Sequence, residues 1–398
     1  MIDTVNKEQC CGCSACANIC PQKAISMQID EEGFYYPIID CQKCVRCNLC
    51  ESVCLACLKK NNDKKDREPV AYAAKANDDE TRKYSSSGGV FSVLSELVLS
   101  ENGIVYGVSM SDDFSRAHHI RISEAEQLKK IRGSKYLYSL NETVFVDVRN
   151  DLEMGKKVLF SGTPCQVCGL KFFLNKEYNN LLCVDVICHG IPSYLIWEEY
   201  LSDIKNILRK PIKSLSFRSK KESWQSFGQE IKAEKKALFY SKEEDVFLRL
   251  FLSDCCLRSS CYNCFVKENG VYLSDITLGD FWSINRVDKS FNDGKGVSLI
   301  VSRSNKGDAI LRKVKNGLML KEEDYFSSIR GNSIIEQTAK PVGRNTFFDD
   351  LERMPIKVAA NKYAPMSLRE KIKSILRRLN LYKPTWRANY GMEFIKSE

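Results

Sequence analysis

The sequence predicts two structural units: a small α+β module built from two repeated halves, followed by a larger α/β domain. Three observations support this prediction. The first 57 residues contain two cysteine runs with the same spacing. A polar segment follows at residues 59–69, and beyond it short β-prone runs alternate with helical patterns, as in α/β domains. At 398 residues the chain is long enough for two or three domains.

The composition is that of a globular protein with many thiols. Hydrophobic residues make up 43% and charged residues 28%, and no apolar run is long enough to span a membrane. The first residues lack the pattern of a signal peptide, so we expect a cytoplasmic protein whose 19 cysteines stay reduced. With only three histidines, the thiolates favour iron-sulfur clusters or all-cysteine zinc. The formal charge of +9 omits anionic clusters, so it does not predict nucleic-acid binding.

The N-terminal module carries two runs with the spacing Cys-x2-Cys-x2-Cys-x3-Cys. The first contains Cys10, Cys13, Cys16 and Cys20, and the second contains Cys44, Cys47, Cys50 and Cys54. This is the spacing of bacterial ferredoxins, in which the fourth cysteine of each run binds the other cluster. We therefore assign one 4Fe-4S cluster to Cys10, Cys13, Cys16 and Cys54, and a second to Cys44, Cys47, Cys50 and Cys20. A pair of zinc knuckles is the alternative, which the lack of histidine in both runs disfavours.

Between the two runs, residues 24–30 and 34–40 are β-prone and joined by a turn, which predicts a hairpin. Residues 1–58 are thus predicted to form a ferredoxin-like module. Residues 59–69, nearly all polar and closed by a proline, are predicted to form a linker. Cys11, Cys41 and Cys57 fall outside the ligand pattern, and we expect packed or solvent-near thiols without a role.

Residues 70–340 are predicted to form the α/β domain. Strands expected at 70–76, 104–110, 158–162 and 181–188 alternate with helices at 90–100, at about 142–154, from 166 and from 193. Ligands of open α/β sheets bind at strand-to-helix turns. The turn at 85–91 places serines and two glycines before an apolar helix, a pattern that suits a phosphate. A helix N-cap with a turn would explain the same residues.

A second group of cysteines lies in this domain. Cys261 and Cys264 form a Cys-x2-Cys pair, which needs two more thiolates to hold a cluster. The candidate suppliers are Cys165 at a strand-to-helix turn, Cys188 at the end of a strand, and Cys256. Cys168 and Cys183 lie within apolar patterns, and we expect them to be buried without a ligand role.

Taken in order, several segments resemble the beta subunit of coenzyme F(420)-reducing hydrogenases and dehydrogenases, a family that includes 7-hydroxymethyl chlorophyll reductase. The segments are the double cysteine run, SSSGG at 85–89, RGSKY at 132–136, GTPCQ at 162–166, CHGIPS at 188–193, RSSCYNC at 258–264 and SDITLGDFW at 274–282. They extend from residue 1 to about residue 305. The resemblance implies that the second unit is an α/β flavin-binding domain with FAD, a third 4Fe-4S cluster and a hydride-exchanging substrate.

The resemblance also implies individual site residues. The residues implied for FAD binding are Ser86, Ser87, Gly88 and Gly89 near the phosphates, and Thr163, Pro164 and Gln166 along the pocket. Arg132 and Lys135 would face the flavin or an anionic substrate as the catalytic pair; otherwise they would be a solvated surface pair. Cys261 and Cys264 would bind the third cluster with Cys165 and Cys188, and Cys256 is the reserve ligand. Leu55 in place of proline, Cys168 after GTPCQ and the extra Cys255 depart from the family pattern.

We therefore predict an iron-sulfur flavoprotein oxidoreductase that passes electrons between its clusters and FAD. Its substrate would be a deazaflavin coenzyme or another organic molecule, and its redox partner a protein or a reduced cofactor. Two competing predictions remain. An electron-transfer subunit would hold clusters without a flavin, and an iron-sulfur scaffold would bind partners without turnover.

Residues 341–398 are predicted to form a basic C-terminal extension. Within it, residues 367–387 carry seven basic residues, one acidic residue and apolar residues at helical spacing. Such an amphipathic helix can lie on an anionic membrane or dock a partner. The alternative is a terminal helix packed on its own domain.

Overall fold

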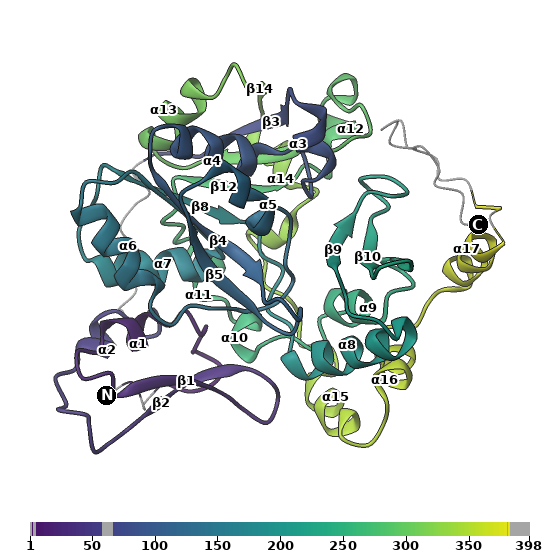
Figure 1. The fold of residues 1–398 in the computed structure, drawn as a ribbon, viewed down its shortest axis with the longest axis horizontal. Helices are drawn as coiled ribbons and strands as arrows, with labels where there is room; N and C mark the ends of the chain where they lie inside the picture. The colour runs from purple at the N-terminus through teal and green to yellow at the C-terminus, as the bar shows by residue number, and fades with distance from the viewer. Residues whose placement is uncertain (1, 3–4, 58–66, 380, 383–398) are drawn as a thin grey trace.

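The computed structural model describes residues 2, 5–57, 67–379 and 381–382 (Figure 1). It contains the N-terminal module, a nine-stranded mixed sheet with helices on both faces, and a smaller three-stranded sheet. The predicted linker lies mostly outside the described residues, as does the end of the predicted C-terminal helix.

The N-terminal module contains a hairpin and two short helices. Its elements are α1 (Ala15–Ile19), β1 (Ile25–Ile29), β2 (Tyr35–Ile39) and α2 (Leu49–Ser52), and β1 pairs antiparallel with β2. The two cysteine runs also repeat in backbone conformation. Gly12 and Arg46, each before the second cysteine of its run, have φ of 72° and 54°, and Ser14 and Asn48, each after it, have φ of 65° and 60°. The predicted hairpin is confirmed, and the repeat in sequence is a repeat in structure.

The large domain is built on a mixed sheet with strand order β14-β3-β13-β12-β8-β7-β4-β5-β6. Its strands are β3 (Val70–Ala76), β4 (Ile104–Met110), β5 (Ala117–Ile122), β6 (Ser139–Leu140), β7 (Val158–Gly162), β8 (Leu181–Val186), β12 (Ile276–Asp280), β13 (Ser298–Ser302) and β14 (Leu318–Glu323). Neighbours β4, β7, β8 and β12 run parallel, whereas β13, β3 and β14 join antiparallel at one edge. The predicted α/β class is therefore confirmed as a large mixed sheet.

Helices cover both faces of the sheet because its inner strands are apolar on both sides. In β7, Val158 and Phe160 pack under α6 (Val144–Glu153) and α7 (Pro164–Leu174), while Leu159 packs on the opposite face. That opposite face is covered by α4 (Val90–Ser100), α5 (Leu128–Ile131) and α13 (Asn305–Lys313). The predicted strands and helices of this region are all present.

A third core joins the small sheet to helices late in the chain. The sheet contains β9 (Ser214–Ser219), β10 (Gly228–Lys232) and β11 (Ala237–Ser241), with β10 in the centre. It packs with α8 (Tyr194–Leu208), α9 (Val246–Leu252), α15 (Arg344–Leu351) and α16 (Ile356–Tyr363). Phe347 of α15 is fully buried there, so the first part of the predicted extension belongs to the folded core.

The remaining described helices are short, apart from one near the C-terminus. They are α3 (Asp79–Lys83), η2 (Ala125–Gln127), α10 (Ser259–Tyr262), α11 (Phe265–Asn269), α12 (Ile284–Val287), η3 (Lys289–Phe291), α14 (Tyr325–Ile329), η4 (Ser333–Ile335) and α17 (Leu368–Arg378). In Figure 1 the N-terminal module lies beside α6 and α7, which cover one face of the large sheet. The small sheet lies on the side of the large sheet away from these two helices.

Candidate functional site

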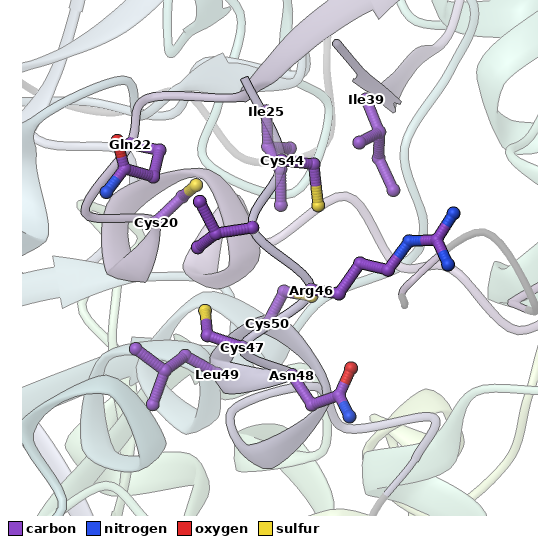
Figure 2. Close-up of a pocket in the computed structure, with 11 residues that line it drawn as sticks. Cys20, Gln22, Ile25, Ile39, Cys44, Arg46, Cys47, Asn48, Leu49 and Cys50 are labelled. Atoms are coloured by element: carbon purple, nitrogen blue, oxygen red, sulfur yellow. The ribbon is translucent and has the colours of Figure 1, made fainter. Parts of the chain in front are cut away.

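Four thiols of the N-terminal module surround one small cavity. Cys20, Cys44, Cys47 and Cys50 line it, and Figure 2 shows that their sulfur atoms lie around a common space. Cys20 follows α1, whereas the other three lie in the loop before α2 and in α2 itself. This is the set that the spacing predicted, three ligands from the second run and one from the first.

The other set predicted in this module gathers around Cys16. Burial raises the pKa of the Cys16 thiol, and the neighbouring thiols of Cys10 and Cys54 raise it further. Cys13 lies beside Cys16 as well. Cluster iron would hold these groups as thiolates, because a bound metal stabilises the deprotonated form.

A single metal ion and a cluster need different separations of their four thiolates. Within the described residues, no three histidine, cysteine, aspartate or glutamate side chains are arranged to hold one metal ion. Four thiolates bound to a single zinc at ~2.3 Å would lie about 3.8 Å from one another. A cubane distributes its four thiolates over four iron atoms.

A third group of thiols forms in the large domain. Cys165 lies in the first turn of α7, Cys188 follows β8, Cys261 lies in α10, and Cys264 precedes α11. Burial is the largest influence on the Cys188 thiol and raises its pKa, while Lys267 lowers it. The neighbouring thiols of Cys261, Cys165 and Cys264 also raise this pKa. The structure therefore brings together the four cysteines that the resemblance favoured.

Cys256, the reserve ligand, lies elsewhere. Its thiol is fully buried, donates to the carbonyl of Leu250 at 3.3 Å and lies beside Cys255. Cys168 of α7 and Cys183 of β8 are fully buried in the core, as the apolar patterns predicted.

Cys11, for which we predicted no role, lies between two of the thiol groups. Its thiol interacts with the thiols of both Cys13 and Cys165, and so connects the first cysteine run with the third group. Gly169 of α7 makes this approach possible, because a Cβ atom there would lie 2.9 Å from the sulfur of Cys13. No motif around Cys11 indicated this contact, because its partner Cys165 lies far along the chain.

Arg258 holds the first cysteine loop on the large domain. Its buried guanidinium donates to the carbonyls of Cys10 at 2.7 Å and Tyr35 at 2.9 Å, and it stacks 3.9 Å from the centre of the Tyr36 ring. Tyr138 adds a hydrogen bond from its hydroxyl to a carbonyl of the same loop. The first and third thiol groups are thereby held next to each other.

A cavity of about 540 Å³ opens at the carboxyl ends of the parallel strands. Val108 of β4, Gly162 of β7, Val186 of β8 and Leu278 of β12 all line it. This is where open α/β sheets bind ligands, and the volume is within the usual range for cofactor sites. Cys188 also lines the cavity, so one member of the third thiol group lies in its wall.

Seven of the nine residues implied for the cofactor and catalysis line this cavity: Ser86, Ser87, Gly89, Arg132, Lys135, Thr163 and Gln166. Gly88 and Pro164 are not among the lining residues. Gly88 is buried behind the turn, where its N–H donates to the Ser298 hydroxyl at 2.9 Å. A Cβ atom there would lie 2.7 Å from the Ser298 nitrogen, so this glycine allows the turn to pack on the sheet.

The serine turn presents an uncapped helix end to the cavity. Gly89, with φ of 90°, is the N-cap residue of α4, as the N-cap alternative allows, and no side chain caps the helix. Gly89, Val90 and Phe91 line the cavity, so the unpaired N–H groups of this first turn lie in its wall. The turn is fixed from outside by Lys220, which donates to the carbonyl of Ser87 at 2.6 Å. These features suit a phosphate group.

Arg132 and Lys135 lie in the cavity wall and not on a solvated surface. The ammonium of Lys135 donates to the carbonyls of Arg132 at 2.9 Å and Gly133 at 3.2 Å. Burial lowers the pKa of Lys135 to about 7. Arg132 donates to the Ser92 hydroxyl at 2.9 Å. Near neutral pH, Lys135 can therefore both accept and release a proton.

Sequence reasoning missed the wall that the small sheet contributes. Arg218 at the end of β9, Phe227 before β10 and Lys242 after β11 all line the cavity, together with Asp280 and Trp282. Asp280 and Trp282 belong to the segment SDITLGDFW, so the resemblance contained a signal for them. Arg218 and Lys242 lie in a region that carried no recognised motif.

The predicted basic helix is present as α17, which begins at a capping box of Ser367 and Glu370. It is attached to the small-sheet region by an ion pair in which Arg377 Nε lies 2.6 Å from a Glu222 oxygen. Its apolar residues Leu368 and Ile375 are 75% and 56% exposed. Within the described residues, no helix has the length and apolar character needed to cross a bilayer.

Comparison with known proteins gives the following matches. Two family profiles describe the two parts of the coenzyme F(420) hydrogenase/dehydrogenase beta subunit: its C-terminal profile matches residues 155–326, and its N-terminal profile matches residues 71–145. A 4Fe-4S binding domain profile matches residues 3–26. No curated protein matches the chain. Among solved structures, the chain is similar to a chain of the F(420)-reducing NiFe hydrogenase complex of Methanosarcina barkeri, with 17% identity, 81% of this chain and 96% of that chain covered, and a TM-score of 0.45.

Proposed function

This chain belongs to the beta-subunit family of coenzyme F(420) hydrogenases and dehydrogenases, and on that premise we propose that it is a flavin-dependent member with three 4Fe-4S clusters. It is an iron-sulfur oxidoreductase with a 4Fe-4S binding domain. The proposal adds FAD in the large cavity, a third cluster and an organic substrate that exchanges a hydride.

The thiol groups supply the proposed cluster ligands. One cluster is bound by Cys44, Cys47, Cys50 and Cys20, one by Cys10, Cys13, Cys16 and Cys54, and the third by Cys165, Cys188, Cys261 and Cys264. In this assignment residues 1–58 form the ferredoxin-like module, residues 59–69 the linker, and residues 70–340 the flavin and third-cluster domain. Residues 341–398 form the C-terminal extension, part of which packs in the core.

The position of Cys188 is the observation that carries the proposal. It lies in the third thiol group and also lines the cavity that collects the residues implied for FAD. A cluster bound there would lie against the cavity wall, and Cys11 brings the N-terminal thiols to the other side of the same group. With clusters bound at these thiols, electrons would have a path from the N-terminal module to the cavity.

The residues of the cavity fit FAD. Ser86, Ser87 and Gly89, with the free N–H groups at the start of α4, would hold the pyrophosphate. Thr163 and Gln166, which form a capping box at the start of α7, would line the pocket beside it. FAD would supply the exchange between hydride transfer and single-electron transfer, which clusters alone do not perform.

Arg132 and Lys135 are the proposed catalytic pair. Arg132 is held by Ser92 and would orient an anionic group, because a guanidinium binds oxyanions through several N–H donors. Lys135, whose pKa is lowered to about 7, would hold or deliver a proton at Nζ during substrate reduction or oxidation.

The proposed partner is a one-electron donor or acceptor protein that meets the N-terminal module. Cys47 is exposed, so the cluster of the second run would lie at the protein surface. The apolar residues Val45 and Leu49, which line the same small cavity, are also exposed and would form part of the contact.

Anaerobic purification with iron, sulfide and FAD measured against protein tests the proposal. About twelve iron atoms and one FAD per chain are expected for three clusters and a flavin. About eight iron atoms without flavin would contradict it and would indicate an electron-transfer subunit. A visible spectrum before and after dithionite distinguishes flavin bleaching from cluster bleaching.

A further inference from the structure

One wall of the large cavity combines aromatic rings with two cations. Trp282 stacks on Trp224 with ring centroids 5.3 Å apart and an angle of 9° between the planes. Phe227 lies on the same group, 6.4 Å from Trp282. Arg218 lies in β9 and Lys242 directly follows β11, and both cations reach these rings. Of these five side chains, all but Trp224 line the cavity.

Arg218 has hydrogen-bonding capacity that the protein leaves unused. Its guanidinium lies 4.2 Å from the centre of the Phe227 ring, faces the Tyr136 hydroxyl, and donates from one nitrogen to Asp280. The other oxygen of Asp280 accepts from the indole of Trp224 at 2.8 Å. Although the Tyr136 hydroxyl lies close, Arg218 Nε and Nη2 are buried and form no hydrogen bond of normal geometry within the described residues. Buried donors without acceptors are costly, so a site of this kind favours a ligand that supplies an acceptor.

Lys242 is the second cation of this wall. Its ammonium lies 5.2 Å from the centre of the Phe227 ring and donates to the carbonyl of Gln225 at 3.3 Å. Burial lowers the pKa of Lys242, and the carboxylate of Glu243 raises it in part. Glu243 lies outside the cavity lining and faces Arg377 at 4.0 Å. The lining carboxylate that also raises the pKa of Lys242, Asp280, is already paired with Arg218.

The cavity as a whole has a surplus of positive charge. Its described lining contains Arg132, Lys135, Arg218 and Lys242 but only one carboxylate, Asp280, which is already paired with Arg218. A pyrophosphate held at the serine turn would bring about two negative charges to the end of the cavity that carries Arg132 and Lys135. The remaining cations lie beside the aromatic wall of the small sheet.

We propose that the substrate of this cavity carries a carboxylate or phosphate next to an unsaturated ring, and that Lys242 and Arg218 bind this oxyanion while Trp282 and Phe227 contact the ring. The inference rests on the proposed function, because it assumes that FAD and substrate share the cavity. Ammonium and guanidinium groups both bind carboxylate and phosphate, and neutral analogues would leave them unpaired.

Isothermal titration calorimetry on the full-length, anaerobically purified protein tests the inference with benzoate and phenyl phosphate as probes. Benzamide, similar in shape but neutral, is the ligand control. We expect Lys242→Gln to weaken binding of both anions at least tenfold, about 1.4 kcal/mol, and Lys242→Arg to retain most of it. Arg218→Lys keeps the pair with Asp280 while losing the forked donors, and should weaken binding in the same direction. Arg286→Gln removes an exposed cation elsewhere and is the matched control.

FAD content, measured on every variant, shows whether Lys242 and Arg218 bind the anionic group of the substrate or the pyrophosphate of FAD. Weakened anion binding with unchanged FAD content supports a substrate site. Loss of FAD in parallel with anion binding would overturn the inference, because the cations would then serve the pyrophosphate. Equal affinity for benzoate and benzamide, or no effect of Lys242→Gln, would also overturn it. Anion binding that depends on Lys242 in a protein without flavin would support this site and contradict the flavoenzyme.

Discussion

Replacing Arg258 by methionine should destabilise the contact between the N-terminal module and the large domain. Methionine has a similar length but donates no hydrogen bond, so the carbonyls of Cys10 and Tyr35 would lose their donors. Each such loss costs about 1–3 kcal/mol, and the stacking on Tyr36 adds up to about 2 kcal/mol. Because one side chain makes all three contacts, the effects overlap, and we expect a total loss of about 3–5 kcal/mol. Arg258→Lys keeps the charge and should lose about half.

Anaerobic urea unfolding followed by circular dichroism measures this change, with iron content determined on the same samples. Arg330→Met is the matched control because Arg330 is exposed. If Arg258→Met unfolds within about 1 kcal/mol of the wild type, as the control should, the guanidinium does not hold the first cysteine loop and the reasoning is refuted.

Three further predictions concern the clusters, the cavity and the C-terminal helix. Cys188→Ser should lower the iron content by about four atoms per chain, whereas Cys256→Ser should leave it unchanged; equal losses would contradict the ligand assignment. Because the pKa of Lys135 is lowered to about 7, its ammonium is charged below that pH and neutral above it. Lys135→Met should therefore weaken binding of inorganic phosphate, measured by calorimetry, at about pH 6 but hardly at about pH 8.5, and an equal effect at both would refute this interpretation. If α17 lies on an anionic membrane, Ile375→Glu should abolish co-sedimentation with phosphatidylserine vesicles. Because Ile375 is 56% exposed, the melting temperature should not change. A wild type that never sediments would rule out membrane docking.

Much of the fold was predictable because the local patterns and the tertiary structure agree. The predicted strand at 158–162 is β7, and its apolar residues on both faces reflect burial between two helical layers. The helix predicted at 90–100 is α4 with the same bounds. The small sheet was not predicted, because its strands are short and carry polar residues on their exposed side. Such strands resemble loops until they pair.

The candidate site was predictable where ligands follow a fixed spacing. The two cysteine runs identify their members from the chain alone, because two-residue gaps place successive thiols around one cluster. Gly88 shows the limit of this reasoning. It belongs to the serine turn in sequence, yet it faces β13 and not the cavity, since the direction of each residue in a turn depends on what packs behind it.

The amino-acid order alone was enough to establish 4Fe-4S binding and family membership, because short-range spacing and the succession of motifs are properties of the chain. The folded arrangement was needed to show that Cys188 and not Cys256 joins the pair Cys261 and Cys264, and that Cys11 lies between two thiol groups. These contacts join residues that are far apart along the chain. Side chains from separate elements meet through strand order and packing, which no local pattern of residues specifies.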